Sequence, residues 1–492
     1  MQPISDADIR VRIASDNRGW ENPDYEAPEA NFARRVYFEP FKRLALNFDV
    51  KRATVLLGPR RVGKTVMIKQ LMHDAVASGI APSNILYVSV DTPIYSGISL
   101  EKFLSFMPSS NGNAKRVVIF DEIQYLRDWE IHLKDLVDST TNIKFVASGS
   151  AAAALQLKSK ESGAGRFSDF MLPPLTFYEF LLFLGEGEKH IRRIDAGPGT
   201  RPRYKYEVTN IESLNTRFVD YLNYGGFPEA VVNEEVRRNP EQFIKNDIID
   251  KVLLKDLPSL YGITGIQELN KLFSFLAYNA GNEASLENIC QESGLSKPTI
   301  KRYIEYLESA FLIIKVSTVD DTCKTMKRER NFKIYLNNPS MRAALFAPVR
   351  ADDGQRIGQL AECAIFSQWQ HSSAFRSLKY ARWKNDGEVD IVHLTGDQKP
   401  RWLGEIKWSD RIQSHWGEET KGLSSMLKRH KSITSAFFTT KTIEAESTLE
   451  GRRLTIYPSA AYCYLVGRNI TSRLDVPLPV ATPDESTKDE EE

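Results

Sequence analysis

The sequence predicts an α/β protein whose first large unit is a doubly wound parallel sheet. Short apolar runs alternate with segments of helical periodicity, which is the pattern of parallel strands joined by crossover helices. A glycine-rich loop follows the first of these runs, and two acidic residues follow the third. Both features are expected at the carboxyl edge of such a sheet, where open α/β sheets bind ligands. The expected strands are 54–57, 85–90, 117–120 and 143–147, with a helix over 66–78.

Composition and charge narrow the class of protein. At roughly 100–200 residues per domain, the 492 residues predict about three domains, and a hydrophobic content of 42% supplies sizeable cores. The net charge of +1 excludes a wholly basic, histone-like protein. However, six acidic residues and one lysine lie within 484–492, so the rest of the chain carries about +6 and tolerates nucleic acid as a partner.

The cysteines and the apolar segments indicate a soluble cytoplasmic protein. The four cysteines are scattered and no pair has Cys-x-x-Cys spacing, so zinc and disulfide frameworks are disfavoured and a reducing compartment fits. No basic region followed by an apolar run marks a secretory signal. The most apolar stretches, around 177–184 and 310–316, are too short to span a bilayer, so we expect no membrane partner.

The glycine-rich loop matches the phosphate-binding pattern G-x-x-x-x-G-K-[ST] without exception. It follows an expected strand and opens an expected helix, so its backbone N–H groups and the helix N-terminus can hold phosphate oxygens. The lysine would reach the β- and γ-phosphates, and the threonine hydroxyl would bind magnesium (Mg²⁺). An accidental glycine-rich turn is the alternative. The loop, which predicts binding of ATP, is Gly58, Pro59, Arg60, Arg61, Val62, Gly63, Lys64 and Thr65.

Polar residues at other strand ends are expected to complete this site. Asp121 follows the third strand and would hold Mg²⁺, and Glu122 beside it would act as the general base for an attacking water. Ser148, after the fourth strand, would sense the γ-phosphate, and Arg166 would serve as an arginine finger or sensor. The alternatives are an ordinary acidic strand end, a polar turn and a surface arginine in a salt bridge.

These motifs, with two later ones, resemble a prokaryotic family of AAA-type P-loop ATPases. The resemblance rests on the phosphate loop, Asp121-Glu122-Ile123-Gln124, Ser148-Gly149-Ser150, the run 174–180 (PLTFYEF) and the turn 224–229 (YGGFPE), and it covers about residues 35–410. The resemblance implies a C-terminal domain of unknown function that combines a winged helix with a nuclease-like fold. It also implies a homo-oligomer.

A helix-turn-helix is expected over 285–307. Gly294 lies at the turn, and Ser296 is a suitable N-cap for a second helix over 297–309, whose buried side would contain Tyr303, Ile304 and Leu307. The first turns of a recognition helix contact DNA. A protein–protein contact is the alternative role for such a module. The candidate DNA-binding residues are Lys297, Thr299, Lys301 and Arg302.

Acidic residues near the C-terminus indicate a metal site. Glu405 and Lys407 in an E-x-K strand project from one face because strand side chains alternate. Asp390 on a neighbouring strand and Glu362 on the preceding helix could join them and hold one or two Mg²⁺ or Mn²⁺ ions, with Lys407 orienting water. The order Glu, Asp, Glu-x-Lys resembles the PD-(D/E)XK nuclease superfamily. The alternative is a structural salt-bridge cluster on an inactive nuclease fold.

The expected order of units follows from these motifs. It is an N-terminal arm (1–48), an AAA-type ATPase core (49–184), a connection rich in Gly, Pro and basic residues (185–210), a helical region (211–283), a winged-helix domain (284–345), a PD-(D/E)XK nuclease-like domain (346–474) and a disordered acidic tail (475–492).

Three functional hypotheses remain open at this point. In the first, the ATPase core powers or gates a C-terminal nuclease that acts on DNA, which is compatible with defence against foreign DNA. In the second, ATP binding switches affinity for DNA or a protein partner, and the nuclease fold is inactive. In the third, the chain is an ATPase that remodels protein, so a protein partner rather than DNA would stimulate hydrolysis.

Overall fold

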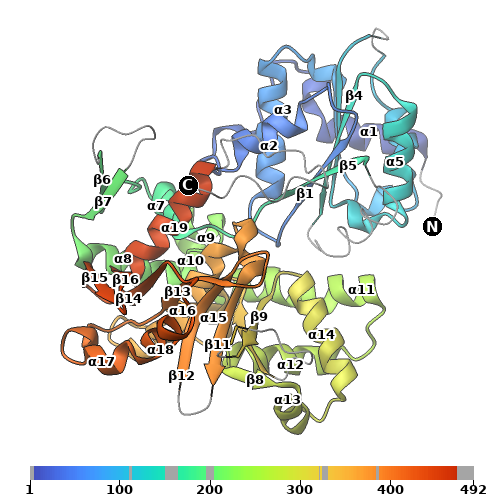
Figure 1. Cartoon of the computed structure of the whole chain (residues 1–492). Helices are drawn as coiled ribbons and strands as arrows, with labels where there is room; N and C mark the ends of the chain where they lie inside the picture. The colour runs from blue at the N-terminus through green and yellow to red at the C-terminus, as the bar shows by residue number, and fades with distance from the viewer. Residues whose placement is uncertain are drawn as a thin grey trace.

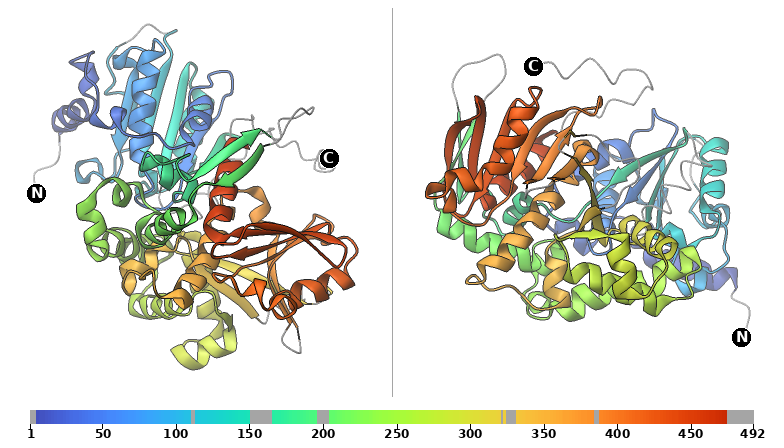
Figure 2. Two further views of the ribbon diagram at one scale, coloured as in Figure 1. Left: turned by 90° about the vertical axis from the view of Figure 1, so that its left-hand side faces the viewer. Right: turned by 60° about the horizontal axis from the view of Figure 1, so that its bottom comes forward.

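The computed structural model describes residues 5–109, 113–149, 165–195, 204–320, 322–323, 331–383 and 387–473. Ser150 and the acidic tail expected over 475–492 lie outside these ranges. Figure 1 shows a parallel α/β unit (blue to cyan) beside a second, mixed sheet (yellow-green to red), with green helices between them. Figure 2 shows the same arrangement from two other sides.

The expected parallel sheet is confirmed. It contains β1 (Ala53–Leu57), β2 (Ile85–Ser89), β3 (Arg116–Asp121), β4 (Ile143–Gly149) and β5 (Phe167–Met171), in the order β2-β3-β4-β1-β5, with every pairing parallel. The helices that join these strands include α3 (Lys64–Ala77), α4 (Leu100–Leu104) and α5 (Trp129–Ser139).

Apolar side chains of this sheet cover both of its faces. Val55 and Leu57 pack into one core, whereas Leu56 between them packs into the other, because successive strand side chains point to opposite faces. Both faces are therefore buried, as a sheet between two helical layers requires. The sequence did not predict β5, because Ser168 and Asp169 interrupt its apolar pattern at the sheet edge.

The N-terminal arm covers the opposite edge of the sheet. It contains α1 (Asp6–Asp16), two short 3₁₀ turns and α2 (Phe38–Ala45). The side-chain amide of Asn17 donates to the Tyr87 carbonyl (2.9 Å) and its Oδ1 accepts from the Tyr87 N–H (2.7 Å). The indole N–H of Trp20 donates to the Ile85 carbonyl (2.8 Å). The arm thus satisfies backbone groups that edge strand β2 would otherwise expose.

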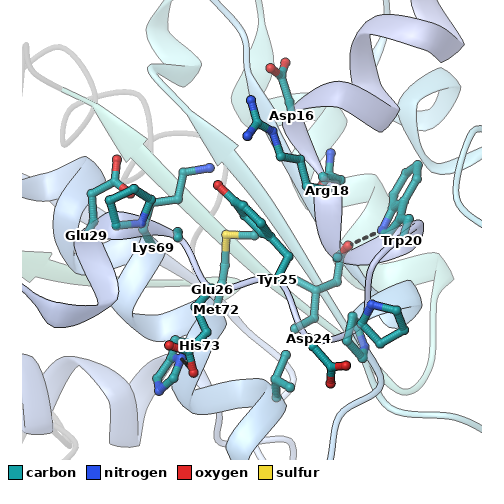
Figure 3. A pocket seen from close by; sticks show the side chains of 18 of the residues that line it. Asp16, Arg18, Trp20, Asp24, Tyr25, Glu26, Glu29, Lys69, Met72 and His73 are labelled. Atoms are coloured by element: carbon teal, nitrogen blue, oxygen red, sulfur yellow. Dashed lines mark hydrogen bonds and ion pairs between the residues drawn. The ribbon is translucent and has the colours of Figure 1, made fainter.

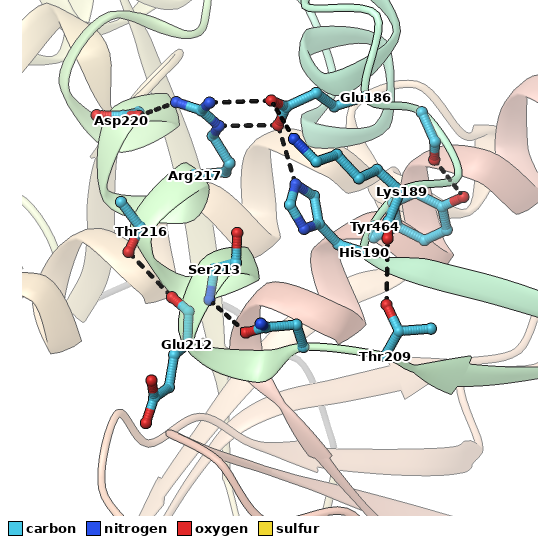
Figure 4. A network of polar contacts seen from close by, with 12 residues as sticks. Glu186, Lys189, His190, Thr209, Glu212, Ser213, Thr216, Arg217, Asp220 and Tyr464 are labelled. Carbon is cyan, nitrogen blue, oxygen red and sulfur yellow. Dashed lines mark hydrogen bonds and ion pairs between the residues drawn. The ribbon is translucent and has the colours of Figure 1, made fainter.

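A polar network fixes the segment that leaves the ATPase-like unit. This segment follows α7 (Phe177–Phe183) and contains an antiparallel pair, β6 (Ile191–Asp195) and β7 (Tyr204–Val208), where the sequence predicted only a connection. Glu186 accepts two hydrogen bonds from Arg217 on α8 (Ile211–Tyr224; 2.8 and 2.9 Å) and one from His190 (2.9 Å), as Figure 4 shows. The bonds from Arg217 lower the pKa of Glu186 to about 2.

The helical region begins with α8 (Ile211–Tyr224) and includes two π-helical segments. Its elements continue with α9 (Pro228–Val232), α10 (Glu234–Arg238), η6 (Glu241–Asp250), η7 (Val252–Asp256), α11 (Leu257–Tyr261) and α12 (Ile266–Tyr278). The π-helical segments are η6 and η7. Such turns are rare and occur frequently at functional sites.

A single mixed sheet then runs through both remaining units. Its order within the described residues is β15-β16-β14-β13-β12-β11-β9-β10-β8. The strands are β8 (Glu283–Ser285), β9 (Ile313–Val319), β10 (Asn331–Leu336), β11 (Leu378–Trp383), β12 (Gly387–Leu394), β13 (Pro400–Glu405), β14 (Ser435–Thr440), β15 (Ala445–Leu449) and β16 (Arg452–Pro458). Since β9 pairs with β11, the boundary expected at 345/346 does not separate two independent sheets.

Helices flank this sheet and connect it to the first unit. They are α13 (Leu286–Ser293), α14 (Lys297–Ser309), α15 (Ser340–Leu345), α16 (Gly354–Trp369), α17 (Trp416–Glu419), α18 (Lys421–Arg429) and α19 (Ser459–Arg473). In Figure 1, α19 lies beside α7 and α8. In the described ranges, none of the helices combines the length and apolar character that crossing a bilayer requires.

Candidate functional site

The glycine-rich loop connects β1 to α3 in a conformation that needs glycine at two positions. A Cβ atom on Gly58 would lie 2.2 Å from the Leu172 carbonyl oxygen, so no side chain fits there. Gly63 has a φ of 95°, in the left-handed region that favours glycine, and directly precedes α3. The loop therefore ends at the N-terminus of α3, where backbone N–H groups of the first helical turn can bind an anion.

Lys64 turns its ammonium back over the same loop. Its Nζ donates to the carbonyls of Gly58 (3.0 Å) and Pro59 (2.7 Å), and the residue is only 6% exposed. Burial lowers the pKa of Lys64. Within the described part of the chain, no carboxylate forms an ion pair with this ammonium. Lys64 is thus a buried cation whose present partners are two neutral carbonyls, and a phosphate would supply the missing negative charge.

Three hydroxyl groups surround the carboxylate of Asp121. Thr65 on α3 donates to Oδ2 (2.8 Å), Tyr87 on β2 donates to the same oxygen (3.0 Å), and Ser148 on β4 donates to Oδ1. Asp121 is 2% exposed, and its partners among the described residues are neutral. The arrangement places the expected magnesium residue Asp121 directly beside Thr65. Sequence reasoning missed Tyr87, which reads only as an aromatic residue of a buried strand.

Glu122 lies next to this carboxylate and is held from both sides. Its backbone adopts a left-handed conformation with a φ of 55°, which turns the chain at the end of β3. Its N–H donates to the Ser148 hydroxyl (3.2 Å), and the side-chain amide of Gln124 donates to its carboxylate. Ser148 therefore bridges both acidic residues, as a member of the site rather than of a separate polar turn. Gln124 is a further site residue that had no expected role.

The two loop arginines contact the helical region. Arg60 donates to both carboxylate oxygens of Asp256 on η7 (2.7 Å each) and to the Tyr125 hydroxyl (3.0 Å). Arg61 pairs with Glu229 (2.9 Å) and with Asp247 on η6 (2.5 Å). The π-helical segments are thus joined directly to the loop by charge-assisted hydrogen bonds, which are stronger than neutral ones.

A buried ion pair contacts the backbone of the phosphate loop. Arg35 of the arm donates to Glu179 on α7 (2.7 and 3.0 Å), to the Val62 carbonyl (2.8 Å) and to the Pro173 carbonyl (2.9 Å). The side chains of Arg35 and Glu179 are 3% and 0% exposed. Because both side chains are buried and directly bonded, the pair fixes the loop, the arm and α7 relative to one another.

The position of Arg166 excludes it as a sensor at the phosphate loop of its own chain. Its carbonyl accepts from the N–H of Ala53, the first residue of β1, and β5 begins directly after it. Arg166 therefore lies at the amino edge of the sheet, opposite the phosphate loop, and its side chain pairs with Asp138. Sequence spacing did not show that its strand is parallel to β1. Arg166 does not reach the loop of its own chain.

A cavity of about 620 Å³ lies between the N-terminal arm and α3. Figure 3 shows Trp20 and Tyr25 of the arm with Lys69, Met72 and His73 of α3 around it. The wall of the cavity mixes acidic, basic and apolar side chains, so its lining does not indicate one class of ligand. Lys69 lines the cavity and also contacts the candidate nucleotide site, because its Nζ lies 3.3 Å from the ring centre of Tyr87.

The expected C-terminal residues also come together, but lysines separate the carboxylates. Lys407 Nζ lies 2.5 Å from Glu405 Oε1 and 3.7 Å from Asp390 Oδ2, and the Ile406 N–H donates to the same Asp390 oxygen (2.9 Å). Burial, together with the charge of Asp390, raises the pKa of Glu405 to about 8. Glu405 Oε2 is buried, and no described residue forms a hydrogen bond with it.

Glu362 joins this group through a second lysine that sequence reasoning missed. Lys333 on β10 contacts Glu362 (2.9 Å), Glu388 (2.9 Å) and Asp390 (3.5 Å), and Tyr335 donates to Glu362. Burial opposes the charge of Lys333, but Glu362 and its neighbours raise the pKa of its ammonium. Among the described residues, no three acidic, histidine or cysteine side chains are grouped closely enough to hold a metal ion as they stand. We call Lys333, Glu362, Glu388, Asp390, Glu405 and Lys407 the carboxylate cluster.

The expected recognition helix is α14, which Ser296 caps through the Thr299 N–H (3.3 Å). The expected burial of its apolar face is confirmed, because Tyr303, Ile304 and Leu307 are at most 4% exposed. Arg302 is exposed on the other side, and Thr299 beside it is partly exposed. The candidate lysines there are exposed but paired, Lys297 with Glu287 (2.5 Å) and Lys301 with Glu305 (4.0 Å).

Comparison with known families supports part of this description. Residues 50–181 match the family model of an AAA domain, and residues 215–353 match a domain of unknown function (DUF8612). The expected AAA-type P-loop domain is therefore confirmed. The second match assigns no activity to the helical region or to the strands that follow it.

Curated relatives carry no assigned function. An uncharacterized protein of Haemophilus influenzae is 28% identical over 282 residues, which are 55% of this chain and 64% of the relative. An uncharacterized protein of Methanocaldococcus jannaschii is 26% identical over 295 residues, 58% of this chain and 61% of the relative. The matched region thus spans about three-fifths of the relatives' length.

Solved structures resemble the chain only loosely. A replication initiator DnaA bound to AMPPCP and single-stranded DNA is 14% identical, covers 58% of this chain and 92% of its own, and gives a TM-score of 0.29. Cdc6p from Pyrobaculum aerophilum is 13% identical, covers 66% of this chain and 96% of its own, and gives 0.28. At these scores, no argument about this chain follows from either structure.

Proposed function

We propose that this chain is an ATPase that binds ATP with Mg²⁺ at the phosphate loop and hydrolyses it. The observation that carries the proposal is the position of Asp121, which accepts from Thr65 of the loop and from Ser148, while Ser148 also accepts from Glu122. Lys64 would bind phosphate oxygens, and Thr65 and Asp121 would hold Mg²⁺. The ion would neutralise the charge that develops on the phosphates during transfer.

The chain's own residues supply the remaining chemistry. Glu122 is the candidate general base, because it is acidic, adjacent to Asp121 and oriented by Gln124. It would orient the attacking water and accept its proton. Ser148 keeps Asp121 and Glu122 in a fixed relation, since its hydroxyl contacts both residues.

The test of this proposal is ATP binding and phosphate release by the full chain. Wild type should bind a fluorescent ATP analogue in the presence of Mg²⁺ and release phosphate. Lys64→Ala should weaken binding by about 100-fold, because charged hydrogen bonds contribute about 1.5–3 kcal/mol each. Lys407→Ala removes a lysine from the carboxylate cluster and should leave nucleotide binding unchanged. Equal binding by wild type and Lys64→Ala would refute the proposal.

We also propose that the chain acts as a homo-oligomer. The support is Arg166, which is 43% exposed at the sheet edge opposite its own phosphate loop, so it is accessible to a neighbouring copy. The measurement is a mixing experiment with Lys64→Ala and Arg166→Ala. If Arg166 completes a neighbour's site, each variant is inactive alone and the mixture regains hydrolysis. Full activity of Arg166→Ala alone would contradict this role.

We propose metal-dependent DNA cleavage at the carboxylate cluster as a second candidate function. The supporting observation is Glu405 Oε2, a buried carboxylate oxygen without a partner, near Asp390 and Lys407. A divalent cation would satisfy it, and Glu362, Asp390 and Glu405 are the oxygen ligands that Mg²⁺ or Mn²⁺ prefers. In this proposal the surrounding sheet is a PD-(D/E)XK nuclease-like fold, and α13 and α14 form a winged-helix module that binds DNA.

A cleavage panel separates this candidate from its alternatives. Single-stranded, linear double-stranded and circular DNA are incubated with the full chain, ATP and Mg²⁺ or Mn²⁺. Cleavage that disappears in both Asp390→Ala and Lys407→Ala supports a nuclease. ATP-dependent DNA retention without cleavage supports a binding switch instead. If only a protein partner stimulates phosphate release, the chain is a remodelling ATPase.

A further inference from the structure

Lys333 contacts three carboxylates, one more than Lys407 does, whereas Lys64 contacts two carbonyls. Lys333 comes from β10, and its side chain is 6% exposed. Its nitrogen contacts Glu362 and Glu388 at 2.9 Å each and Asp390 at 3.5 Å. A lysine ammonium has three N–H donors, and here three carboxylates surround it. No donor is left for a phosphate group, so Lys333 is unsuited to bind the backbone of a nucleic acid.

Asp390 divides the carboxylate cluster into two halves. Its Oδ1 faces Lys333, together with Glu362 and Glu388, and its Oδ2 faces Lys407, together with Glu405. In the first half a cation lies among three carboxylates. In the second half, Glu405 Oε2 is buried without a partner. The first half is therefore already filled by a positive charge, whereas the second retains an unsatisfied oxygen.

The formal charges agree with this division. With every group ionised, the four carboxylates and two ammonium groups of the cluster would sum to a net charge of −2, which one divalent cation would neutralise. A second ion would bring an excess of positive charge into a buried site, at high desolvation cost. The ammonium also holds its nearest oxygens at 2.9 Å, whereas Mg²⁺ draws oxygen ligands to about 2.0–2.1 Å.

We propose that Lys333 is a built-in cation that occupies one of two cation positions in the carboxylate cluster. The cluster consequently takes a single divalent ion, held by Asp390 and Glu405, where a site without this lysine would take two. This inference deepens the second candidate function and rests on it for the ion at Asp390 and Glu405. The position of Lys333 itself does not depend on cleavage.

Counting bound Mn²⁺ tests the proposal without any cleavage assay. The full chain is titrated with Mn²⁺ in the absence of nucleotide, and bound ions are counted by electron paramagnetic resonance. Lys333→Met keeps the length of the side chain but removes its charge, and it should bind one more Mn²⁺ per chain than wild type. Lys333→Arg, which keeps the charge, should match wild type. Lys399→Met, an exposed lysine between β12 and β13, is the control and should also match.

The outcomes separate the inference from the function on which it rests. Glu405→Gln identifies the ion of the cluster, since only that ion should be lost. If Glu405→Gln changes nothing but Lys333→Met gains an ion, the proposed metal site of the second candidate function fails and the role of Lys333 stands. If Lys333→Met gains no ion, or wild type already holds a coupled pair of ions that Glu405→Gln removes, the inference is overturned. The wild-type count requires no variant of Lys333, so it applies even if Lys333→Met does not fold.

Discussion

The phosphate loop and the carboxylate cluster contain the same chemical groups in opposite arrangements. At the loop, within the described residues, Lys64 donates to two carbonyls and Asp121 accepts from three hydroxyls, so these two charged groups form no ion pair. In the cluster, Lys333 and Lys407 lie directly between carboxylates. A site with separated charges can accept an anion and a cation together. A site with paired charges must first break its own contacts.

This difference predicts how each region responds to ligands. Burial lowers the pKa of Lys64, although the charges of Glu122 and Asp121 oppose this shift. Nucleotide binding should therefore relieve an unfavourable charge and stabilise the N-terminal unit, by about 2.7 kcal/mol when ATP is at 100 times its Kd. A metal ion that binds at the carboxylate cluster would stabilise the protein less, because it competes with ion pairs that already exist.

The largest expected effect comes from Glu122→Gln. The variant keeps the shape and hydrogen bonds of the side chain but cannot accept a proton, so hydrolysis should fall by about 10²–10⁴-fold. ATP affinity should stay within about threefold, because Lys64 and Thr65 are untouched. Single-turnover phosphate release and equilibrium binding measure the two quantities separately.

A matched change in the other region checks that this loss is local. Asp390→Asn removes one negative charge from the carboxylate cluster and should leave the rate of ATP hydrolysis unchanged in the absence of DNA. If Asp390→Asn slows hydrolysis as much as Glu122→Gln, the two regions share one site of chemistry and the comparison fails. If Glu122→Gln hydrolyses ATP at the wild-type rate, the general base is another residue.

The two regions also differ in how much of each could be predicted from sequence. The phosphate loop is a run of consecutive residues, and Asp121 follows an apolar strand, so local pattern and strand direction are sufficient to place them. The carboxylate cluster depends on pairing between distant strands. Lys333 looked like an ordinary strand residue, because nothing in its local sequence shows that β9 pairs with β11 and carries β10 beside α16.

The same reason explains which features of the fold and the site could not be placed from sequence. Arg166 follows a glycine and looked like a catalytic arginine, but only the parallel pairing of β5 with β1 places it at the far edge. Asp256 is one acid among many in a helical region, and its contact with Arg60 spans 196 residues of sequence. Contacts of this kind are set by tertiary packing, which leaves no periodic pattern in the sequence.

The second prediction makes the same substitution in both regions. Glu179→Gln leaves the Arg35 guanidinium buried without a counter-ion, so the N-terminal unit should lose about 3–5 kcal/mol of stability. Glu405→Gln should change stability by less than about 1 kcal/mol, because the raised pKa of Glu405 already favours a neutral side chain and Lys407 keeps Asp390 as a partner. Calorimetric unfolding of both variants measures the difference. Comparable losses would show that the cluster is as dependent on its charges as the Arg35–Glu179 pair.

The third prediction concerns the contact between the loop and the π-helical segments. Asp256→Asn weakens the paired hydrogen bonds to Arg60, so backbone hydrogen exchange over 241–256 should become about 10–100-fold faster, corresponding to about 1.4–2.8 kcal/mol. In wild type, ATP should alter exchange in the same segment, and in the variant that response should be lost. Glu241→Gln, on the exposed face of η6, is the control and should leave both measurements unchanged. If ATP does not change hydrogen exchange over 241–256 in wild type, the loop arginines do not transmit nucleotide binding to the π-helical segments.

The smallest expected effect lies outside both regions, on the exposed face of α14. If this helix contacts DNA phosphates, Lys297→Gln and Lys301→Gln should each lower the slope of log Kd against log salt concentration by about 1 or less. The effect is limited because each lysine already pairs with an acid, and Glu287 lies only 2.5 Å from Lys297. Glu287→Gln should therefore strengthen DNA binding at low salt, which a fluorescence anisotropy titration can detect. Identical salt slopes for wild type and both lysine variants would show that these lysines do not contact DNA phosphates and would favour a protein-binding role for α13 and α14. DNA cleaved at the carboxylate cluster would then have to bind through another surface.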